Sequence, residues 1–367
     1  RVPGVTLDPI GLYFQRNQTW FNQSKAWIQY LARTQSLLQL GKPVTDIAVF
    51  SGDELPSRAS LPSALTQTLP GLFEPEKIEA QKLRLQNTGQ PMRQEPVGVS
   101  FTANTYQAKD WINPLRGYLY DSFNADALEQ LRYTNGALQT PSGSIYKILV
   151  IAADTLMNPS MHIRPVLVQH IMRLVAEGAT VIVDKAYASQ FTNAFSKAGI
   201  AWKTEVHVSN PQAIYGKGKL IQGPIQQSDF TELGTNPDVT VVNKAAVKAS
   251  HISFTHRVYG NTHIYFVSNQ SGKNIQPQLL FRQSGVPFIL DPVTVQSQIP
   301  AYAKTNPAQN VVELNLAANE SKFIVFTEAP EKSIVQKAPA SISNTKPTLF
   351  DKQWKIYFDS SLGGPSL

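Results

Sequence analysis

Cysteine is absent from this sequence of 367 residues. Its absence excludes disulfide bonds, thiolate metal sites and cysteine nucleophiles together. A chain without thiols fits a reducing compartment, and it fits equally well a bacterial exported protein that avoids them. The cysteine content therefore leaves the compartment open.

Long apolar runs and clusters of basic residues are also missing. No segment approaches the roughly 20 consecutive apolar residues that a membrane span requires. The 33 Lys and Arg against 26 Asp and Glu give a net charge of +7, but these residues are scattered along the chain. Nucleic-acid-binding proteins instead cluster their positive charge. We therefore expect neither a membrane span nor a nucleic-acid partner.

Several catalytic motifs are missing as well. The chain has no G-x-S-x-G motif, which excludes the nucleophile elbow of the serine hydrolases. The 6 histidines are dispersed, and no H-E-x-x-H motif is present, so the spacing typical of a zinc site is not found. We expect no metal site and no cofactor in this chain.

The length is enough for two or three domains of roughly 150 residues each. Residues 24–41 predict a helix, with Ser24 as the N-cap and Gly41 just past its end. A short buried strand, Ile47–Phe50, follows. Residues 52–117 are rich in Pro, Gly, Gln and Asn apart from a helical stretch near 75–86. Loops of this length are usually functional or packed onto another domain.

The middle of the chain alternates strands and helices. A helix near 125–132 precedes strands at 146–151 and 180–184, which flank a helix from Pro165 to about Glu177. The apolar strands "ILVIAA" and "TVIVD" predict a parallel sheet covered on both faces. A helix at 188–198 and a strand at 218–223 extend this open α/β domain. "GKGK" (216–219) precedes a strand rather than a helix, which favours a hairpin turn over a phosphate loop.

From about residue 251 the hydrophobic period changes to two. Short strands separated by Gly, Asn and Pro turns predict an antiparallel β-sandwich. They are "HISFTHRV", "THIYFVSNQ", "PQLLFRQSG", "PFILDPV", "NVVELNL" and "SKFIVFTEA". His256 and His263 flank one of the turns, and we expect both on the surface.

An aromatic and amide-rich stretch, "FQRNQTWFNQSKAW", occupies residues 14–27. Rings such as Trp20 can stack on the C–H faces of a sugar, while Arg16, Asn17 and other amides can hydrogen-bond its hydroxyls. Domain interfaces favour the same residue types. The residues alone do not decide between a sugar site and an interface.

Carboxylates at three positions are candidates for glycoside hydrolysis, which uses a pair of them. Asp53 and Glu54 follow a buried strand, and Asp121 lies in "GYLYDSF". Adjacent residues of an extended chain point to opposite faces, so Asp53 and Glu54 cannot face each other as a pair. Turn capping or an ordinary loop salt bridge is the simpler explanation for each of the three.

The order of several motifs resembles a known family. "GLYFQRNQTWFNQSKAWIQYLARTQSLLQLGKPVTDIAVFSGDELP" is followed by "GYLYDSFNADAL", "GSIYKILVIAADTLMNP", "LVAEGATVIV", "GKGKLIQG", "HRVYGNTHIYFVSNQ", "FRQSGVPFILDPVT" and "SKFIVFTEA". Together they resemble the C-terminal half of glycoside hydrolase family 106, the α-L-rhamnosidases, over about residues 1–330. No single motif identifies the family, but the order of all of them along the chain is specific to it.

The resemblance implies an exported bacterial enzyme, periplasmic or extracellular, whose catalytic (β/α)8 barrel mostly precedes this chain. The implied fold class is α/β plus β: the end of a barrel, an open flavodoxin- or amidotransferase-like α/β domain, and a small antiparallel β-sandwich. The expected segments are the last strand, loop and helix of the barrel (1–44), the α/β domain (45–248) with a loop insertion (52–117), the sandwich (249–328), a linker (329–348) and the start of a further β-sandwich (349–367).

The resemblance also implies chemistry. Family members invert configuration with two glutamates and bind calcium, so we expect the catalytic residues, and any calcium, outside this chain. Barrel active sites lie on loops after strand ends, which would put Arg16, Asn17, Thr19 and Trp20 at the rim of the substrate pocket, with Asp53, Glu54 and Asp121 at its edge. The expected partners are a rhamnose-containing oligosaccharide or polysaccharide and the barrel half itself.

A second hypothesis is a non-catalytic carbohydrate-binding or scaffold fragment, in which the α/β and sandwich domains only brace a partner. In either case we expect the isolated chain to be inactive, because it lacks the barrel.

Overall fold

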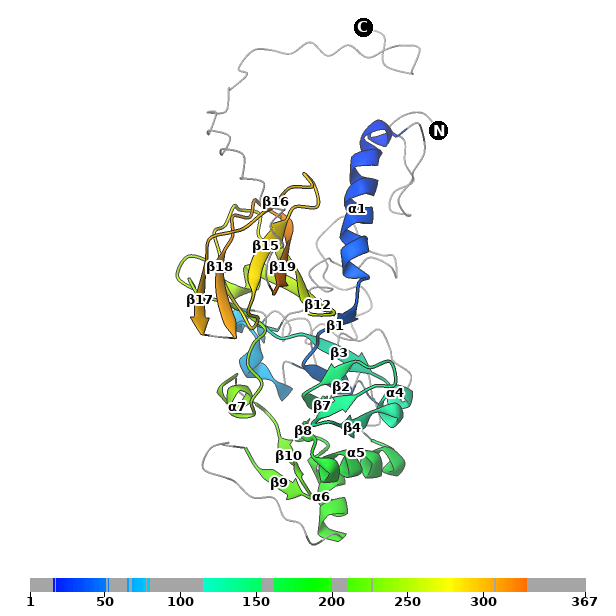
Figure 1. Ribbon diagram of the computed structural model, residues 1–367. Coiled ribbons are helices and arrows are strands. Elements are labelled where there is room, and N and C mark those ends of the chain that lie inside the picture. Colours follow the sequence, from blue (N-terminus) through cyan, green and yellow to red (C-terminus); the bar gives the residue numbers. More distant parts are fainter. Residues whose placement is uncertain are drawn as a thin grey trace, which may run out of the picture.

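The computed structural model describes residues 16, 18–50, 52, 65, 68–76, 78–79, 115–153, 162–197, 199, 210–225, 227–306 and 308–328. It shows an α/β sheet at one end, a β-sandwich next to it, and a helix, α1, that stands beside the sandwich (Figure 1). The predicted linker (329–348) and the further β-sandwich (349–367) lie outside the described residues, as does most of the loop insertion 52–117.

Helix α1 spans Ser24–Leu38 and follows a 3-10 turn at Phe21–Gln23. The sequence predicted Ser24 as the N-cap, but Gln23 occupies that position. The Ser24 hydroxyl instead donates a hydrogen bond of 2.6 Å back to the carbonyl of Phe21, inside the preceding turn. Of the helix residues, Thr34 alone is buried. Arg33 attaches the helix to the sandwich by donating to the carbonyls of Pro292 and Val293.

The α/β sheet has six strands in the order β3-β2-β7-β8-β10-β9. They are β2 (Ile47–Phe50), β3 (Tyr120–Phe123), β7 (Ile148–Ile151), β8 (Thr180–Val183), β9 (Gln212–Tyr215) and β10 (Gly218–Gln222). All neighbouring strands run parallel except β9, which pairs antiparallel with β10. The order of the parallel strands is the flavodoxin-like one.

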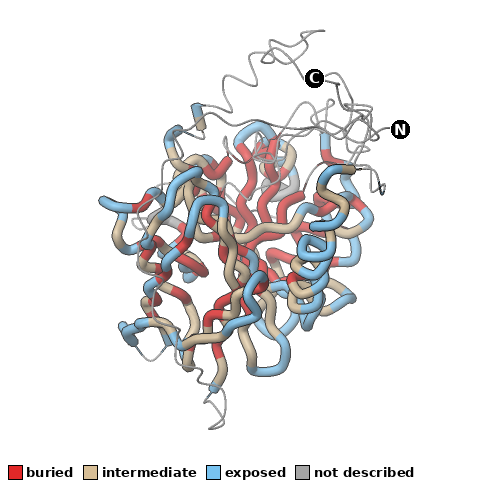
Figure 2. The backbone as a smooth tube through the Cα atoms, turned by 90° about the horizontal axis from the view of Figure 1, so that it is seen from above, coloured by how far each residue is buried: buried red, intermediate tan, exposed pale blue. Residues whose placement is uncertain are grey.

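Two apolar clusters cover the two faces of this sheet. On one face lie α4 (Ala125–Gln130), α5 (Pro165–Glu177) and α6 (Ala188–Lys197). On the other face lie residues of the 65–73 region together with Phe230 of α7 (Gln227–Glu232). In Figure 2 the buried strands form the centre of the molecule, with exposed segments around them. The continuous apolar strands are explained by this double coverage.

The predicted βαβ unit is confirmed: β7 and β8 are parallel neighbours, and α5 lies between them in the chain. The predicted hairpin turn at "GKGK" is also confirmed, since β9 and β10 pair on either side of it. Gly216 takes a φ of +61° there, a conformation that glycine adopts without steric cost. Of the helix predicted near residues 75–86, residues 75, 76, 78 and 79 are described and helical.

A small antiparallel sheet joins α4 to β7. It consists of β4 (Arg132–Thr134), β5 (Ala137–Gln139) and β6 (Ile145–Tyr146). Asn135 and Gly136 connect β4 to β5, and both have positive φ, as a two-residue hairpin turn of the Asn-Gly type requires.

The predicted sandwich strands are all present, and two antiparallel sheets enclose a common core. One sheet has the order β1-β12-β13-β19-β15-β16 and the other β11-β14-β18-β17. The strands are β1 (Lys42–Pro43), β11 (Val239–Val241), β12 (Ile252–Tyr259), β13 (Thr262–Asn269), β14 (Gln278–Phe281), β15 (Val286–Leu290), β16 (Ser297–Gln298), β17 (Tyr302–Asn306), β18 (Gln309–Glu313) and β19 (Ser321–Thr327). Two of these strands, β1 and β11, precede residue 249 in the chain and join one sheet each.

No helix in the described ranges is both long and apolar enough to cross a bilayer.

Candidate functional site

A shallow hollow lies at the start of α1. Trp20, Gln23, Ser24 and Trp27 line it, and its volume is about 270 Å³. Residues spaced three, four and seven apart lie on one side of a helix, and the 3-10 turn continues that side back to Trp20. The hollow therefore presents the two indole rings, and its surface is almost entirely apolar. Such a surface can pack against the apolar face of a sugar ring.

The predicted rim residues are partly described. Arg16 and Thr19 are exposed in the turn before the helix, and Trp20 is half-buried. Asn17, Asp53 and Glu54 lie outside the described residues. Gln23 and Trp27 were not predicted as site residues, although the seven-residue spacing of the two tryptophans could have indicated them.

Asp121 lies on β3, which Figure 1 places well apart from the start of α1. The Tyr146 hydroxyl donates a hydrogen bond of 2.9 Å to Asp121 Oδ2. Burial, together with the charge of Asp121, raises the pKa of Tyr146, so this phenol stays protonated and keeps donating. The structure thus pairs Asp121 with a tyrosine and does not bring it together with Trp20.

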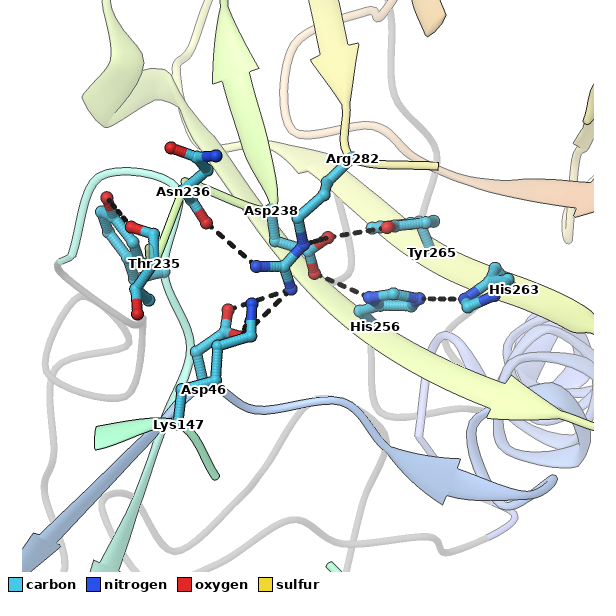
Figure 3. Close-up of polar contacts among 10 residues, drawn as sticks. Asp46, Lys147, Thr235, Asn236, Asp238, His256, His263, Tyr265 and Arg282 are labelled. Atoms are coloured by element: carbon cyan, nitrogen blue, oxygen red, sulfur yellow. Dashed lines mark hydrogen bonds and ion pairs between the residues drawn. The ribbon is translucent and has the colours of Figure 1, made fainter. Parts of the chain in front are cut away.

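A buried ionic network joins the α/β domain to the sandwich (Figure 3). Arg282 follows β14 and lies between two carboxylates, at 3.0 Å from Asp46 Oδ2 and 3.8 Å from Asp238 Oδ1. Lys147 contacts Asp46 from the other side at 3.2 Å. Asp46 precedes β2 and Asp238 precedes β11, so this arginine connects the beginnings of strands in two different domains.

Asp238 continues the network into the sandwich. His256 Nδ1 lies 2.7 Å from Asp238 Oδ2, and His256 Nε2 lies 2.9 Å from His263 Nδ1. The Tyr265 hydroxyl donates to Asp238 Oδ1 at 2.7 Å, and its ring stacks on that of His256 with centroids 3.9 Å apart. Burial alone would raise the pKa of Asp238, but the hydrogen bond and charge of His256, aided by Arg282, lower it overall.

The prediction that both histidines lie on the surface is wrong for His256, which is 1% exposed, while His263 is half-buried. The period-two pattern contained the signal, because His256 follows Phe254 by two residues and therefore shares its face. Phe254 is buried in the sandwich core. The polarity of histidine favours the surface, but the alternation of the strand places His256 on the buried face.

This network is suited to holding two domains together rather than to catalysis. Its carboxylates are almost completely buried and already face cations or hydrogen-bond donors. Hydrolysis needs an acid and a base that reach a substrate and an attacking water, and this sealed arrangement offers neither. Among the described residues, no three His, Asp or Glu side chains are placed to hold a metal ion.

The comparison with protein families is decisive for identity. The model of Glyco_hydro_106, described as alpha-L-rhamnosidase, matches residues 1–92 and 98–304. The chain belongs to glycoside hydrolase family 106. This confirms the resemblance read from the order of the sequence motifs.

Two relatives show how much of a family member is present. A solved rhamnosidase from Novosphingobium sp. PP1Y is 26% identical with a TM-score of 0.61, and the match covers 91% of this chain but 27% of that one. A protein of Formosa agariphila, provisionally named a beta-glucuronidase, is 27% identical over 351 residues, which are 94% of this chain and 24% of the relative. The chain thus spans about a quarter of the length of each.

Removal of the Arg282 charge tests the network. We expect Arg282→Met to destabilise the protein by about 3 kcal/mol, because Asp46 and Asp238 would stay buried without the cation that they share. Urea unfolding at neutral pH measures the change. Lys304→Met on the exposed strand β17 is the control and should change stability by less than about 0.5 kcal/mol. If Arg282→Met lowers the free energy of unfolding by less than about 1 kcal/mol, the bridge contributes little to stability.

The stability of the sandwich should also fall on mild acidification. Burial, reinforced by the charge of His256, lowers the pKa of His263 from 6.5. The folded state therefore favours the neutral ring, and its contribution to stability is complete above pH 6.5 and is lost as the pH falls towards the folded pKa. Urea midpoints measured between pH 7.5 and 5 should decrease, and His263→Asn should flatten this part of the profile. An unchanged slope in that variant would assign the decrease to other groups.

Proposed function

We propose that this chain is the C-terminal portion of an inverting α-L-rhamnosidase, from the end of the catalytic barrel onward, and that it contributes one wall of the substrate pocket. The match of the family model carries the proposal. The likeness to the Novosphingobium rhamnosidase supports it over most of this chain. Since this chain corresponds to about a quarter of that structure, the catalytic acid and base would lie in the remainder of the enzyme.

The positions of three described carboxylates support a catalytic acid and base outside this chain. Asp46 and Asp238 are buried in ion pairs, and Asp121 accepts a hydrogen bond from a tyrosine. An inverting enzyme needs two carboxyl groups about 6.5–9.5 Å apart with room for a sugar and a water between them. None of these three meets that requirement.

Helix α1 would be the last helix of the catalytic barrel. Its apolar residues Trp27 and Ile28 are 41% and 50% exposed, and Thr34 is its single buried residue among those described. An isolated helix of 15 residues is marginal in water, so a neighbour that covers this surface would stabilise it. The turn before α1 would then lie at the barrel face where active sites are found.

At that face Arg16, Asn17 and Thr19 would hydrogen-bond the hydroxyls of a terminal rhamnosyl unit, while Trp20 would form an apolar wall beside the ring. The hollow lined by Trp20 and Trp27 supports this role. Asp53, Glu54 and Asp121 stay predictions for the edge of the pocket. The enzyme would act on a rhamnose-containing oligosaccharide or polysaccharide in the periplasm or outside the cell.

Calcium is implied by the family for the whole enzyme. No three acidic or histidine side chains of the described residues are arranged to bind a metal, and calcium in the rest of the enzyme stays an expectation.

Two other functions compete with this proposal. The Formosa relative carries the provisional name of a beta-glucuronidase, so a glucuronoside is the alternative substrate. A purely carbohydrate-binding or scaffolding role is the alternative from a different class.

Activity measurements separate these functions. The full-length protein should hydrolyse an aryl α-L-rhamnoside with inversion, and the chain of residues 1–367 alone should not, because the catalytic acid and base would lie in the remainder of the enzyme. Release of nitrophenol and the NMR signal of the first anomer formed are the readouts. Hydrolysis of an aryl β-glucuronide in its place would change the substrate assignment. Inactivity on both, with binding retained, would favour the carbohydrate-binding role.

Substitutions at the proposed rim test the pocket. In the full-length enzyme, Arg16→Ala and Trp20→Ala should each lower kcat/KM at least about tenfold, or about 1.4 kcal/mol of transition-state stabilisation. The melting temperature should stay close to that of the wild type, because Arg16 is exposed and Trp20 is half-buried. Gln29→Ala on the exposed side of α1 is the control. Unchanged kinetics with a large fall in melting temperature would make this stretch a domain interface, since truncating a buried tryptophan costs about 3–5 kcal/mol.

A further inference from the structure

A cleft of about 240 Å³ lies between the α/β domain and the sandwich, separate from the hollow at α1. The α/β domain contributes Glu74, Glu76, Arg116 and Gly117 to its lining, and the segment from β11 to β12 contributes the rest. Small-molecule sites favour such junctions between domains, and their volumes start at roughly 300 Å³. The cleft lies just below this lower limit, so a ligand in it would be no larger than about one ring.

The two sides of the cleft meet at Gly117. The backbone N–H of Asp238 donates a hydrogen bond of 2.7 Å to the carbonyl of Gly117. A Cβ on Gly117 would lie 2.3 Å from the carbonyl oxygen of Val239, and its φ of +77° also favours glycine. The domains thus touch directly through their backbones at this point, which fixes the position of one wall relative to the other.

The floor of the cleft is apolar and its rim is charged. The floor consists of Val239, Val241, Val247, Ile252 and Phe254. Three cations, Arg116, Lys244 and Lys248, and two anions, Glu74 and Glu76, line the rest. Lys248 and Glu76 form an exposed ion pair of 2.8 Å between the two sides. Their hydrogen bond lowers the pKa of Glu76 and raises that of Lys248, so both stay charged at neutral pH.

Arg116 lines the cleft, and its guanidinium group is held in place from one side. One of its terminal nitrogens donates to the carbonyl of Gly71. Its Nε atom is buried and, within the described part of the chain, has no hydrogen-bond acceptor, since Glu74 Oε1 lies 3.9 Å away. A buried donor left without an acceptor costs roughly 1–3 kcal/mol.

These groups specify the ligand. Arginine and lysine only donate hydrogen bonds, and carboxylates only accept them. A ligand in this space must therefore offer acceptors to the cations and donors to Glu74 and Glu76, and it must also place an apolar face on the valines and Phe254. A simple anion meets the first requirement but would be repelled by the two glutamates. A hydroxylated ring meets all three, because each hydroxyl both donates and accepts.

We propose that this interdomain cleft is a second carbohydrate-binding site, which takes a single neutral pyranose unit away from the catalytic pocket. It would hold a neighbouring part of a polysaccharide while the catalytic pocket acts on a chain end. The site is formed entirely by residues of this chain. It does not depend on the barrel or on the rhamnosidase activity proposed above.

The experiment is acetylation of lysines in the full-length protein, read by mass spectrometry, with L-rhamnose and D-glucose as neutral ring probes. A one-ring ligand of this kind should bind with a Kd of about 1 mM. At ten times that concentration, Lys244 and Lys248 should react about tenfold more slowly if the bound sugar covers them. Lys304, which is exposed on β17 and does not line the cleft, should react at an unchanged rate.

A pair of matched variants locates the bound sugar. Thr240→Trp places an indole in the cleft and should abolish the protection, whereas Val242→Trp, two residues further at an exposed position outside the lining, should preserve it. Circular dichroism and melting temperature verify that both variants fold. Protection that persists in Thr240→Trp would place the sugar elsewhere and overturn the proposal.

Three further outcomes would overturn it. No protection by either sugar at ten times the expected Kd means that no neutral ring binds there. Protection by inorganic phosphate but not by the sugars makes the cleft an anion site, and protection by D-glucuronate alone makes it a site for an acidic sugar. Because the readout is lysine reactivity, an enzyme without rhamnosidase activity can still show protection, so failure of the proposed function and failure of this site are distinguishable.

Discussion

The contact on which the rest of the structure depends is the arginine bridge at the domain junction. Arg282 contacts Asp46 from the α/β domain and Asp238 from the sandwich, with both carboxylates nearly inaccessible to water. A buried ion pair is weak evidence for net stability, because desolvation offsets most of its attraction. It is demanding in geometry, however, since each charge must keep its partner. The bridge therefore acts mainly as a constraint on how the two domains are oriented.

Both proposed sugar sites follow from that constraint. The cleft lies where the two domains meet at Gly117, and Asp238 takes part in both the bridge and the backbone contact with Gly117. Helix α1 is attached to the sandwich through Arg33 and continues into β1, which pairs with β12. The orientation of the sandwich thus influences where the turn at Arg16 and Trp20 is held. A domain without catalytic groups can in this way still position a wall of an active site.

Much of the fold could be predicted because single elements carry strong patterns. The strands 148–151 and 180–183 are uninterrupted apolar runs, and α5 between them begins at a proline and ends before Gly178. What could not be predicted depends on contacts between distant residues. Ser24 is a good N-cap type, but the turn before it offered the Phe21 carbonyl as a partner. Asp238 lies in a plain "NPDVT" segment, and nothing local indicates that Arg282 and His256 will enclose it. The same contrast holds for the two candidate sites. The stretch around Trp20 is a local pattern and could be found from composition, whereas the cleft combines residues from two domains and could not.

The pairing of β1 with β12 has a consequence for how this chain is made. Lys42 and Pro43 lie opposite Val258 and Arg257, so one edge of the sandwich is completed by a segment synthesised more than two hundred residues earlier. Contacts between residues so far apart in sequence form slowly, because a long loop must close first. Until then, the apolar strand β12 has an unpaired edge that can pair with another chain. The early segment at 42–43 therefore covers the end of that edge at Arg257 and Val258, and a sandwich produced without it would expose these backbone groups even if all its own core residues were present.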